Sequence, residues 1–315
     1  MMTNRRCLSP LRIVVTGASG FVGSTLVGEL QAREHDVYGW SRQHNGFDLD
    51  QLASESVSAY WECQLSDIDV VVHAAALVHQ TNESKADAAS YQHINADATF
   101  ALARIAQQAG VKRLVFFSTA KVYGEGNAGC YRESSTPEPQ DEYARSKLRA
   151  EQILQRISQQ TGIEVVILRP PLVYGLGVGG NFKTLWRIAR TGWPLPLAQV
   201  CNRRDMVAVD NLVEVAAICC EDERAAGHIF NVADAQPYSL SEIIRSIRRA
   251  NADRERLWPL PESLLWKLVL SLRGADDARR LLGDFCVDTE LVRHTLGWLP
   301  RADMKTTVEQ MARSN

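Results

Sequence analysis

The chain has 315 residues and a mass of 35.1 kDa, enough to bury a large core in one domain or in two closely joined domains. Hydrophobic residues make up 45% and charged residues 23%, as is usual for a soluble enzyme. The formal net charge of -2 gives no electrostatic basis for binding nucleic acid or an anionic membrane, so we expect neither partner.

The seven cysteines are scattered, odd in number and without a CxxC pair. This usage predicts a reducing, cytoplasmic location and argues against a disulfide framework or a structural zinc. No His, Asp or Glu cluster has metal-ligand spacing, so no metal is expected. The first residues include Arg5 and Arg6 but no apolar segment, which predicts no signal peptide. The apolar stretch 264–272 is too short for a transmembrane segment; we expect a packing helix, or alternatively a helix on a membrane surface.

The first predicted element is a buried strand at 13–15, followed by a glycine turn and a helix with apolar residues at helical spacing. The unpaired N–H groups of a helix N-terminus can hold a phosphate. Gly17 permits the turn, Gly20 lets backbone approach a pyrophosphate, and Gly23 lets the helix pack on the strand. The GxxGxxG spacing predicts a dinucleotide site, with an ordinary βα turn as the alternative. The expected cofactor contacts here are Gly17, Ser19, Gly20, Phe21 and Val22.

The second predicted strand, at 36–40, ends in Ser41 and Arg42, with no acidic residue at this point. NAD sites usually place an acid here for the ribose hydroxyls, whereas an arginine suits the 2′-phosphate of NADP. The sequence therefore favours NADP(H), with NAD(H) as the alternative if Arg42 is only a solvated loop residue. Asp48 and Leu49 are expected near the adenine edge.

A third buried strand, 68–76, ends in Ala74, Ala75 and Ala76, whose small side chains let a cofactor approach the backbone. His73 precedes them, and we expect it to have a structural or cofactor-adjacent role rather than a catalytic one. A helix at about 95–109 and a strand at 113–119 follow. This alternation predicts an α/β fold with a Rossmann-type doubly wound parallel sheet, which binds ligands at the carboxyl ends of its strands.

The most informative pair is Tyr143 and Lys147, four residues apart on one face of a predicted helix that begins at 141. A free phenol has a pKa near ~10, and a nearby ammonium with an oxidised nicotinamide favours the phenolate. Lowering the pKa by ~3 units requires ~4 kcal/mol of differential interaction. Tyr143 would then be the acid or base, Thr119 would hold the same substrate oxygen, and Lys147 would also bind the nicotinamide ribose. The alternative is a surface helix with a solvated lysine.

These features resemble the extended short-chain dehydrogenase/reductase family, the nucleotide-sugar epimerases and dehydratases. The resemblance covers essentially the whole chain and rests on the glycine turn, His73-Ala-Ala, Asn95, Ser118-Thr119, Tyr143-x-x-x-Lys147, Arg169-Pro-Pro-x-Val-Tyr-Gly175, Arg204 ahead of Val209-Asp-Asn-Leu212, and Leu296-Gly-Trp-x-Pro300. It implies that Asn95 and Pro170 also contact the cofactor. It further implies a dinucleotide-binding domain at 1–170, with a return segment at about 204–226, and a smaller C-terminal α/β substrate domain at 171–315.

The resemblance also implies which residues bind the nucleotide sugar. Asn181, Arg204 and either Arg279 or Arg280, with Arg280 preferred, would contact the diphosphate or nucleotide, since a planar guanidinium can bind phosphate oxygens bidentately. Lys121 is expected to contact the substrate. Many relatives carry Asn where this chain has Leu172, so any contact there is lost or replaced.

Within the family, the segments 119–125, 179–182, 194–197 and 202–204 look like the bacterial UDP-hexosamine enzymes of lipopolysaccharide O-antigen synthesis. That group implies hydride transfer at sugar C4. Because Ser41-Arg42 suggests a consumable NADPH, we favour reduction of a UDP-4-keto-6-deoxy-N-acetylhexosamine over a 4-epimerase with tightly bound NAD. An alternative of another class is a non-catalytic NADP-binding regulator. The resemblance also implies a homodimer formed through the helices at 95–109 and 141–160.

Overall fold

The computed structural model describes residues 9–52, 55–78, 88–126 and 129–314 of the chain. The chain divides into two compact units. The first comprises 1–119, 141–169 and 213–230, and the second 120–140, 170–212 and 231–315. The sequence suggested a single boundary at 170, with one return segment at about 204–226. In the structure each unit has three segments, because 120–140 joins the second unit and the return to the first unit begins at 213.

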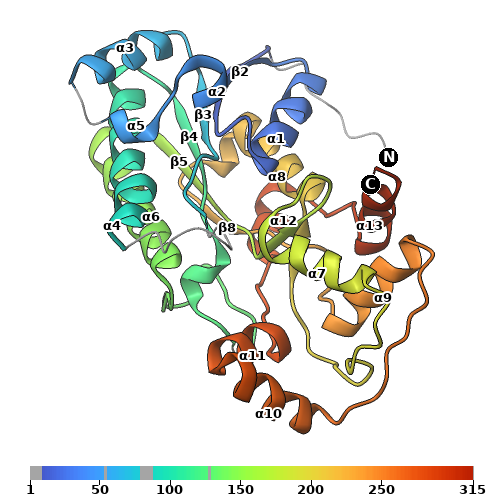
Figure 1. The fold of residues 1–315 in the computed structure, drawn as a ribbon. Coiled ribbons are helices and arrows are strands. Elements are labelled where there is room, and N and C mark those ends of the chain that lie inside the picture. Colours follow the sequence, from blue (N-terminus) through green and yellow to red (C-terminus); the bar gives the residue numbers. More distant parts are fainter. Residues whose placement is uncertain (1–8, 53–54, 79–87, 127–128, 315) are drawn as a thin grey trace. The chain divides into compact units, whose positions relative to one another are not determined.

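The first unit is built on a six-stranded sheet in the order β2-β1-β3-β4-β5-β8 (Figure 1). The strands are β1 (Arg12–Thr16), β2 (Asp36–Trp40), β3 (Val70–His73), β4 (Arg113–Phe117), β5 (Glu164–Arg169) and β8 (Ile229–Asn231). The pairs from β2 to β5 run parallel. The chain leaves β1 towards β2 on one side and returns to β3 on the other. This switch point is where open α/β sheets bind ligands, and the expected fold class is confirmed.

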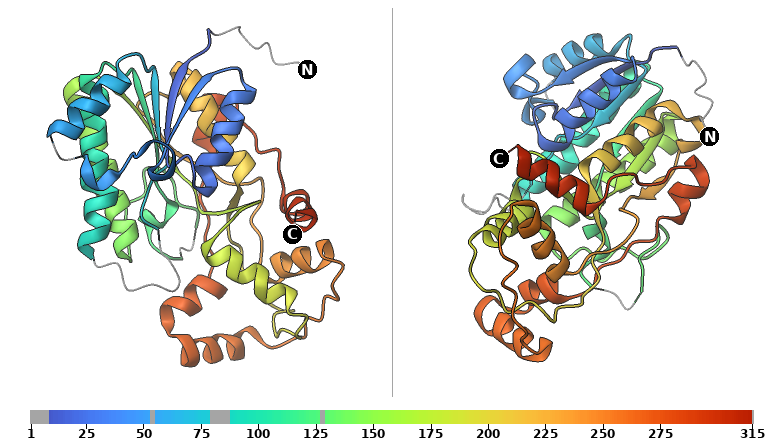
Figure 2. Two further views of the ribbon diagram at one scale, coloured as in Figure 1. Left: turned by 45° about the horizontal axis from the view of Figure 1, so that its top comes forward. Right: turned by 90° about the vertical axis from the view of Figure 1, so that its right-hand side faces the viewer.

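Helices cover both faces of this sheet, as Figure 2 shows. On one face, α3 and α6 pack against α5, with apolar side chains such as Leu102, Leu114 and Leu154 fully buried between helix and strand. On the other face, α1 packs on β1 and β2, and Arg33 after α1 pairs with Glu221 at the end of α8. The helical elements are α1 (Phe21–Ala32), α2 (Arg42–Asn45), η1 (Leu49–Gln51), α3 (Glu55–Leu65), α4 (Ala88–Gln92), η2 (His93–Asp97), α5 (Ala98–Gln108), α6 (Glu142–Thr161), α8 (Val209–Glu221), which starts in the second unit, and η4 (Glu223–Ala225).

The second unit has its own core, in which α9 (Leu240–Ala250) packs against both α7 (Gly180–Arg190) and α13 (Met304–Arg313). Its two-stranded parallel sheet pairs β6 (Leu172–Tyr174) with β7 (Met206–Ala208). Tyr174, Phe182 and Ile244 are fully buried in this core. Its helical elements are η3 (Ala120–Tyr123), α7 (Gly180–Arg190), α9 (Leu240–Ala250), α10 (Glu262–Arg273), α11 (Ala275–Leu282), α12 (Glu290–Leu296) and α13 (Met304–Arg313).

The structure corrects the expectation that the cysteines form no disulfide. Cys130 and Cys286 are bonded, with their Cα atoms 4.4 Å apart and a sequence separation of 156. The odd number of cysteines did not indicate this bond, because two cysteines from distant segments can pair whether the total is odd or even. Cys63, Cys201, Cys219 and Cys220 are free thiols, and Cys7 lies outside the described residues.

The apolar stretch 264–272 forms most of α10. Leu265 is buried, and Trp266 and Val269 pack against the core of the second unit, as a packing helix requires. On its other side the helix leaves Leu264, Leu268 and Leu272 exposed. None of the helices in the described part of the chain is both long enough and apolar enough to cross a bilayer.

Candidate active site

The glycine turn follows β1 and leaves no room for side chains at two of its glycines. Gly17 has φ +72°, and a Cβ there would lie 2.7 Å from the backbone nitrogen of Ala75, beyond the end of β3. A Cβ on Gly23 would lie 2.2 Å from the carbonyl oxygen of Gly17. The close contact of Gly17 with Ala74 and Ala75 brings the predicted cofactor residues after β1 and β3 together at the switch point of the sheet.

The N-terminus of α1 is open to an anion. Its N-cap, Gly20, supplies no side-chain cap, and the first turn contains no acidic residue. The N–H groups of the first turn, which begins with Phe21 and Val22, therefore keep the partial positive charge of a 12-residue helix. Ser19 lies in the preceding turn and is exposed. A tight glycine turn leading into an uncapped helix fits the pyrophosphate of a dinucleotide.

The end of β2 is hydrogen-bonded to the same turn. The carbonyl oxygen of Trp40 accepts the N–H of Gly17 at 2.9 Å, so Ser41 and Arg42 follow directly beside the glycines. Ser41 is buried, whereas Arg42 begins α2 and is exposed.

Asp48 and Leu49, the next two residues predicted to contact the cofactor, are half-buried. Asp48 caps η1 by accepting the N–H of Asp50, and Leu49 is the first residue of that short helix.

His73 is held as a neutral, structural side chain. The hydroxyl of Thr99 donates to the carbonyl of Asn95 at 2.8 Å, so it accepts from Nε2 of His73 at 3.0 Å. Nδ1 of His73 therefore accepts from the hydroxyl of Thr16 at 2.7 Å. Complete burial, followed by the charge of Lys147, lowers the pKa of His73 to about 3. The ring therefore stays uncharged and links β1, β3 and α5.

Asn95 is engaged with protein groups. Its Oδ1 accepts the N–H of Leu77 at 2.7 Å, and its Nδ2 donates to the Leu77 carbonyl and to the Ser146 hydroxyl, both at 3.0 Å. The amide thus fastens the segment after β3 to α6, one residue before Lys147. Ala74, Ala75 and Ala76 in that segment are half-buried.

Tyr143 and Lys147 lie one turn apart near the start of α6. Asp141 caps this helix by accepting the N–H of Ala144 at 2.7 Å, which places Tyr143 in the first turn. The Nζ of Lys147 lies 4.2 Å from the ring centroid of Phe116 on β4. Thr119, which is 8% exposed, follows the end of that same strand. The structure therefore places the predicted catalytic residues on α6 and just beyond the end of β4, the strand whose Phe116 ring Lys147 contacts.

Burial dominates the protonation of this pair. It lowers the pKa of Lys147 to about 7, against the opposing effect of Glu151. It also raises the pKa of Tyr143 well above the ordinary value, with Asp141 and Tyr91 adding to the effect. The lowered phenol pKa expected from the sequence requires the charge of an oxidised nicotinamide beside the lysine. The protein groups alone raise this pKa, because burial penalises the phenolate.

A buried ion pair next to Lys147 was not anticipated from the sequence. Glu151, one turn further along α6, accepts from Nε of Arg169 at 3.0 Å and from the hydroxyl of Ser118. Glu151 and Arg169 are 1% and 3% exposed. Such a pair locks α6 to the ends of β4 and β5, because breaking it would leave a buried charge without its partner.

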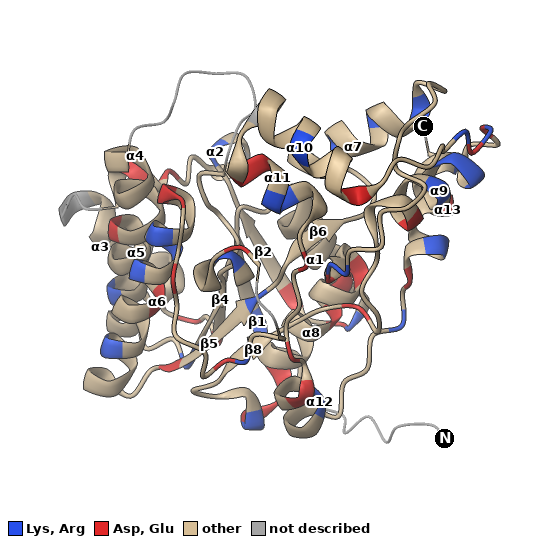
Figure 3. Ribbon diagram, turned by 90° about the horizontal axis from the view of Figure 1, so that it is seen from below, with Lys and Arg blue, Asp and Glu red and all other residues tan. Residues whose placement is uncertain are grey.

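In the second unit, Arg204 and Arg280 share one carboxylate. Nη2 of Arg204 lies 3.4 Å from one oxygen of Glu125, and Nε of Arg280 lies 3.5 Å from the other. Arg279 instead lies 3.9 Å from Asp276 and is more exposed. Figure 3 shows both signs of charge on α11, the helix that carries Asp276, Arg279 and Arg280.

The other predicted residues of this unit are spread along it. Asn181 is exposed in the first turn of α7, and Lys121 is half-buried in η3. Pro170 follows β5, and its carbonyl accepts the N–H of Ala120 at 2.8 Å. Leu172 is 42% exposed on β6.

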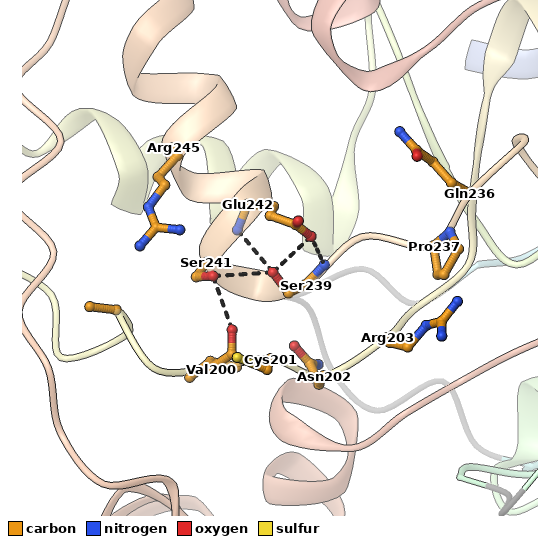
Figure 4. A pocket seen from close by; sticks show the side chains of 11 residues that line it. Val200, Cys201, Asn202, Arg203, Gln236, Pro237, Ser239, Ser241, Glu242 and Arg245 are labelled. Atoms are coloured by element: carbon orange, nitrogen blue, oxygen red, sulfur yellow. Dashed lines mark hydrogen bonds between the residues drawn. The ribbon is translucent and has the colours of Figure 1, made fainter.

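A surface pocket of this unit lies at the start of α9 (Figure 4). Ser239 and Glu242 form the capping box of α9, and the hydroxyl of Ser241 donates to the carbonyl of Val200. These polar groups are thus committed to holding the helix in place.

Comparison with known proteins agrees with this geometry. Residues 13–233 match the model of the NAD dependent epimerase/dehydratase family. A UDP-glucose 4-epimerase of Vibrio cholerae is 35% identical over 97% of this chain and 95% of its own length. The crystal structure of a UDP-N-acetylglucosamine 4-epimerase from Bacillus cereus has a TM-score of 0.78 at 21% identity, covering 96% of this chain and 99% of that one. The structure of RMD from Pseudomonas aeruginosa, complexed with NADPH, has a TM-score of 0.76 at 22% identity, covering 96% and 97%. The chain therefore belongs to the NAD dependent epimerase/dehydratase family, within the extended short-chain dehydrogenases/reductases.

Proposed function

We propose that the protein oxidises and re-reduces C4 of a UDP-hexose or UDP-N-acetylhexosamine, as a nucleotide-sugar 4-epimerase. The observation that carries this proposal is the placement of Tyr143 and Lys147 one turn apart on α6, with Lys147 against Phe116 of β4, the strand that precedes Thr119. Similarity over nearly the whole chain to a protein named UDP-glucose 4-epimerase supports the same chemistry.

In this proposal Tyr143 moves the proton and Thr119 orients the oxygen. The phenol oxygen accepts the proton of the sugar 4-hydroxyl during oxidation and gives it back during reduction. Thr119 holds that oxygen by a hydrogen bond. Lys147 binds the nicotinamide ribose, and its charge favours the phenolate. The nicotinamide cofactor, held beside these residues, would supply the acceptor and donor of the C4 hydride, and its positive charge in the oxidised form would also favour the phenolate.

The glycine turn and the N-terminus of α1 would hold the pyrophosphate of the cofactor. Gly17 and Gly20 allow backbone N–H groups to approach the phosphates, Gly23 lets α1 pack closely on the turn, and Asp48 and Leu49 lie at the start of η1, after the end of β2. Arg204 and Arg280 would bind the diphosphate of the substrate, with Lys121 and Asn181 as further contacts. We also propose that the protein acts in the cytoplasm as a homodimer.

A second candidate is an NADPH-dependent 4-ketoreductase, favoured by Ser41 and Arg42. These residues follow directly after the hydrogen bond between Gly17 and Trp40, where the ribose of the adenosine half would lie. An arginine there suits a 2′-phosphate, and NADPH suits a reductant that is consumed at every turnover. Its substrate would be a UDP-4-keto-6-deoxy-N-acetylhexosamine.

The test identifies the cofactor that copurifies with the protein and then assays both reactions. The epimerase proposal predicts bound NAD and interconversion of UDP-GlcNAc with UDP-GalNAc, or of UDP-glucose with UDP-galactose. Consumption of added NADPH with the 4-keto sugar, without either interconversion, would establish the second candidate instead. The absence of all these reactions, in a protein that binds a dinucleotide, would favour a non-catalytic NADP-binding regulator.

A further inference from the structure

Glu125 occupies the position between two arginines where an anion would be expected. Its side chain is 10% exposed, and its two oxygens face different partners, Nη2 of Arg204 at 3.4 Å and Nε of Arg280 at 3.5 Å. A carboxylate placed in this way resembles a phosphate group, because both present several oxygens to planar guanidinium donors.

The protein backbone fixes Arg204 independently of Glu125. Its Nη1 donates to the carbonyl of Gly283 at 2.9 Å, and its guanidinium lies 5.6 Å from the ring centroid of Phe285. The N–H of Phe285 in turn donates to the carbonyl of Arg203 at 2.8 Å. The Arg204 guanidinium therefore keeps its place when the carboxylate moves.

The segment that carries Glu125 is tied to the segment that follows Arg280. Tyr131 pairs with Val287, and the N–H of Tyr131 donates to the carbonyl of Cys286 at 2.8 Å. The disulfide between Cys130 and Cys286 joins the same two segments. These contacts join the chain that follows Glu125 to the chain that follows Arg280.

The local charges make Glu125 a competitor for an anionic ligand. Two guanidiniums and one carboxylate leave one positive charge, whereas the arginines alone would offer two. Burial lowers the pKa of Arg204, and Arg280 acts in the same direction, while Glu125 and Asp284 oppose this change. Without the carboxylate, two partly desolvated cations would repel each other.

We propose that Glu125 is an internal stand-in for the ligand's diphosphate: it holds Arg204 and Arg280 together in the free protein and is displaced when a nucleoside diphosphate group binds. This inference rests on the proposed function, because it takes the arginine pair as the diphosphate site. Glu125 thus sets specificity. A diphosphate with two charged groups displaces it readily, whereas a singly charged phosphate diester gains less from the exchange.

The test is the binding of UDP, of inorganic pyrophosphate and of uridine to the full-length protein and its E125Q variant, measured by calorimetry. E125Q removes the charge of the competitor and keeps the shape. Binding of UDP and pyrophosphate should become about three- to tenfold tighter, and uridine binding should not change. Without ligand, E125Q should melt about 2–4 °C lower, because the arginines lose their counter-ion. The exposed Glu138 of the same segment gives the control E138Q, which should change neither quantity.

The two proposals fail in different ways. UDP binding that is unchanged or weaker in E125Q would overturn the stand-in role and leave the UDP-sugar function intact. Tighter pyrophosphate binding in E125Q without any UDP binding would support the stand-in and overturn the UDP-sugar function. Binding of neither ligand to either protein would overturn both. If Glu125 were merely structural, E125Q would lower both the melting temperature and the UDP affinity. If Glu125 is the stand-in, E125Q lowers the melting temperature and raises the UDP affinity.

Discussion

At the scale of residues, the site depends on two titratable side chains on α6, the buried Lys147 and the half-buried Tyr143. Lys147 is 2% exposed and packs on the Phe116 ring, while Tyr143 lies edge-to-face with Tyr91 at a centroid distance of 6.4 Å. Burial disfavours the charged form of each, so the protein groups alone keep the phenol protonated. The active protonation state therefore depends on ligands that bring further charge to the site.

Replacing Tyr143 with Phe should abolish most turnover and preserve binding. The ring still packs against Tyr91, but no hydroxyl remains to carry the proton, so kcat should fall by about 10²–10⁴-fold. The cofactor content and the UDP affinity should stay within about twofold of the parent protein. Turnover by Tyr143→Phe at the parent rate would exclude the proposed role of this phenol.

Lys147→Met tests the cost of the buried lysine through the pH dependence of stability. The pKa falls from 10.5 in the unfolded chain to about 7 in the folded protein, so below pH 7 the lysine is charged in both states and its full desolvation cost is present. That cost fades as the pH rises towards 10.5, because the folded protein then releases its proton first. On nucleotide-free protein, Lys147→Met should gain about 2–4 kcal/mol at pH 6.5. Thermal melts at pH 6.5 and 9.5 should show the gain shrinking at the higher pH; an equal difference at both would contradict burial as the cause.

At the scale of elements, the strand–turn–helix of β1 and α1 was predictable because its determinants are local in sequence. The turn is indicated by Gly17, Gly20 and Gly23, and the start of α6 is indicated by Asp141, which caps the helix at Ala144. Three other features join segments that are far apart in sequence: the contact of Ser118, Glu151 and Arg169, the disulfide, and the pairing of Glu125 with two arginines. No periodicity or motif reports which of many charged residues will meet in this way.

The turn and its helix offer a matched pair of glycine variants. Gly17→Ala meets both a positive φ and a contact of 2.7 Å with Ala75, so it should strongly reduce dinucleotide binding. Gly28→Ala adds the same methyl group to an exposed position of α1 where nothing lies within 4 Å. This control should bind normally and gain about 0.5–1 kcal/mol from higher helix propensity. Fluorescence titration with NAD and with NADPH measures the affinity of each variant. Equal affinities of the two variants would show that the turn does not bind the cofactor.

The disulfide should contribute measurably to the stability of the second unit. Closing a loop across 156 residues restricts the unfolded chain, and the double variant C130S/C286S should lose about 3–5 kcal/mol of unfolding free energy. A dithiol reductant should lower the stability of the parent protein by a similar amount and leave the double variant unchanged. Identical denaturation curves for the parent protein with and without reductant would show that this bond contributes nothing.

At the scale of the whole molecule, the two units divide the proposed work. The first holds the glycine turn, Thr119, Tyr143 and Lys147, and the second holds Arg204 and Arg280. Family membership follows from residues in both, since the family match extends from 13 to 233. The identity of the sugar depends on the shape of a binding pocket, for which the one-dimensional pattern offers no local marker.

The most direct test of C4 chemistry follows an isotope. UDP-glucose and UDP-N-acetylglucosamine labelled with deuterium at C4 are incubated with the purified protein, and the products are examined by NMR and mass spectrometry. A 4-epimerase should invert C4 of one of these sugars and retain the deuterium at C4, since the same hydride is removed and returned, and Tyr143→Phe should invert neither. Failure to invert either sugar, or inversion with loss of the deuterium to solvent, would contradict the proposed 4-epimerase activity.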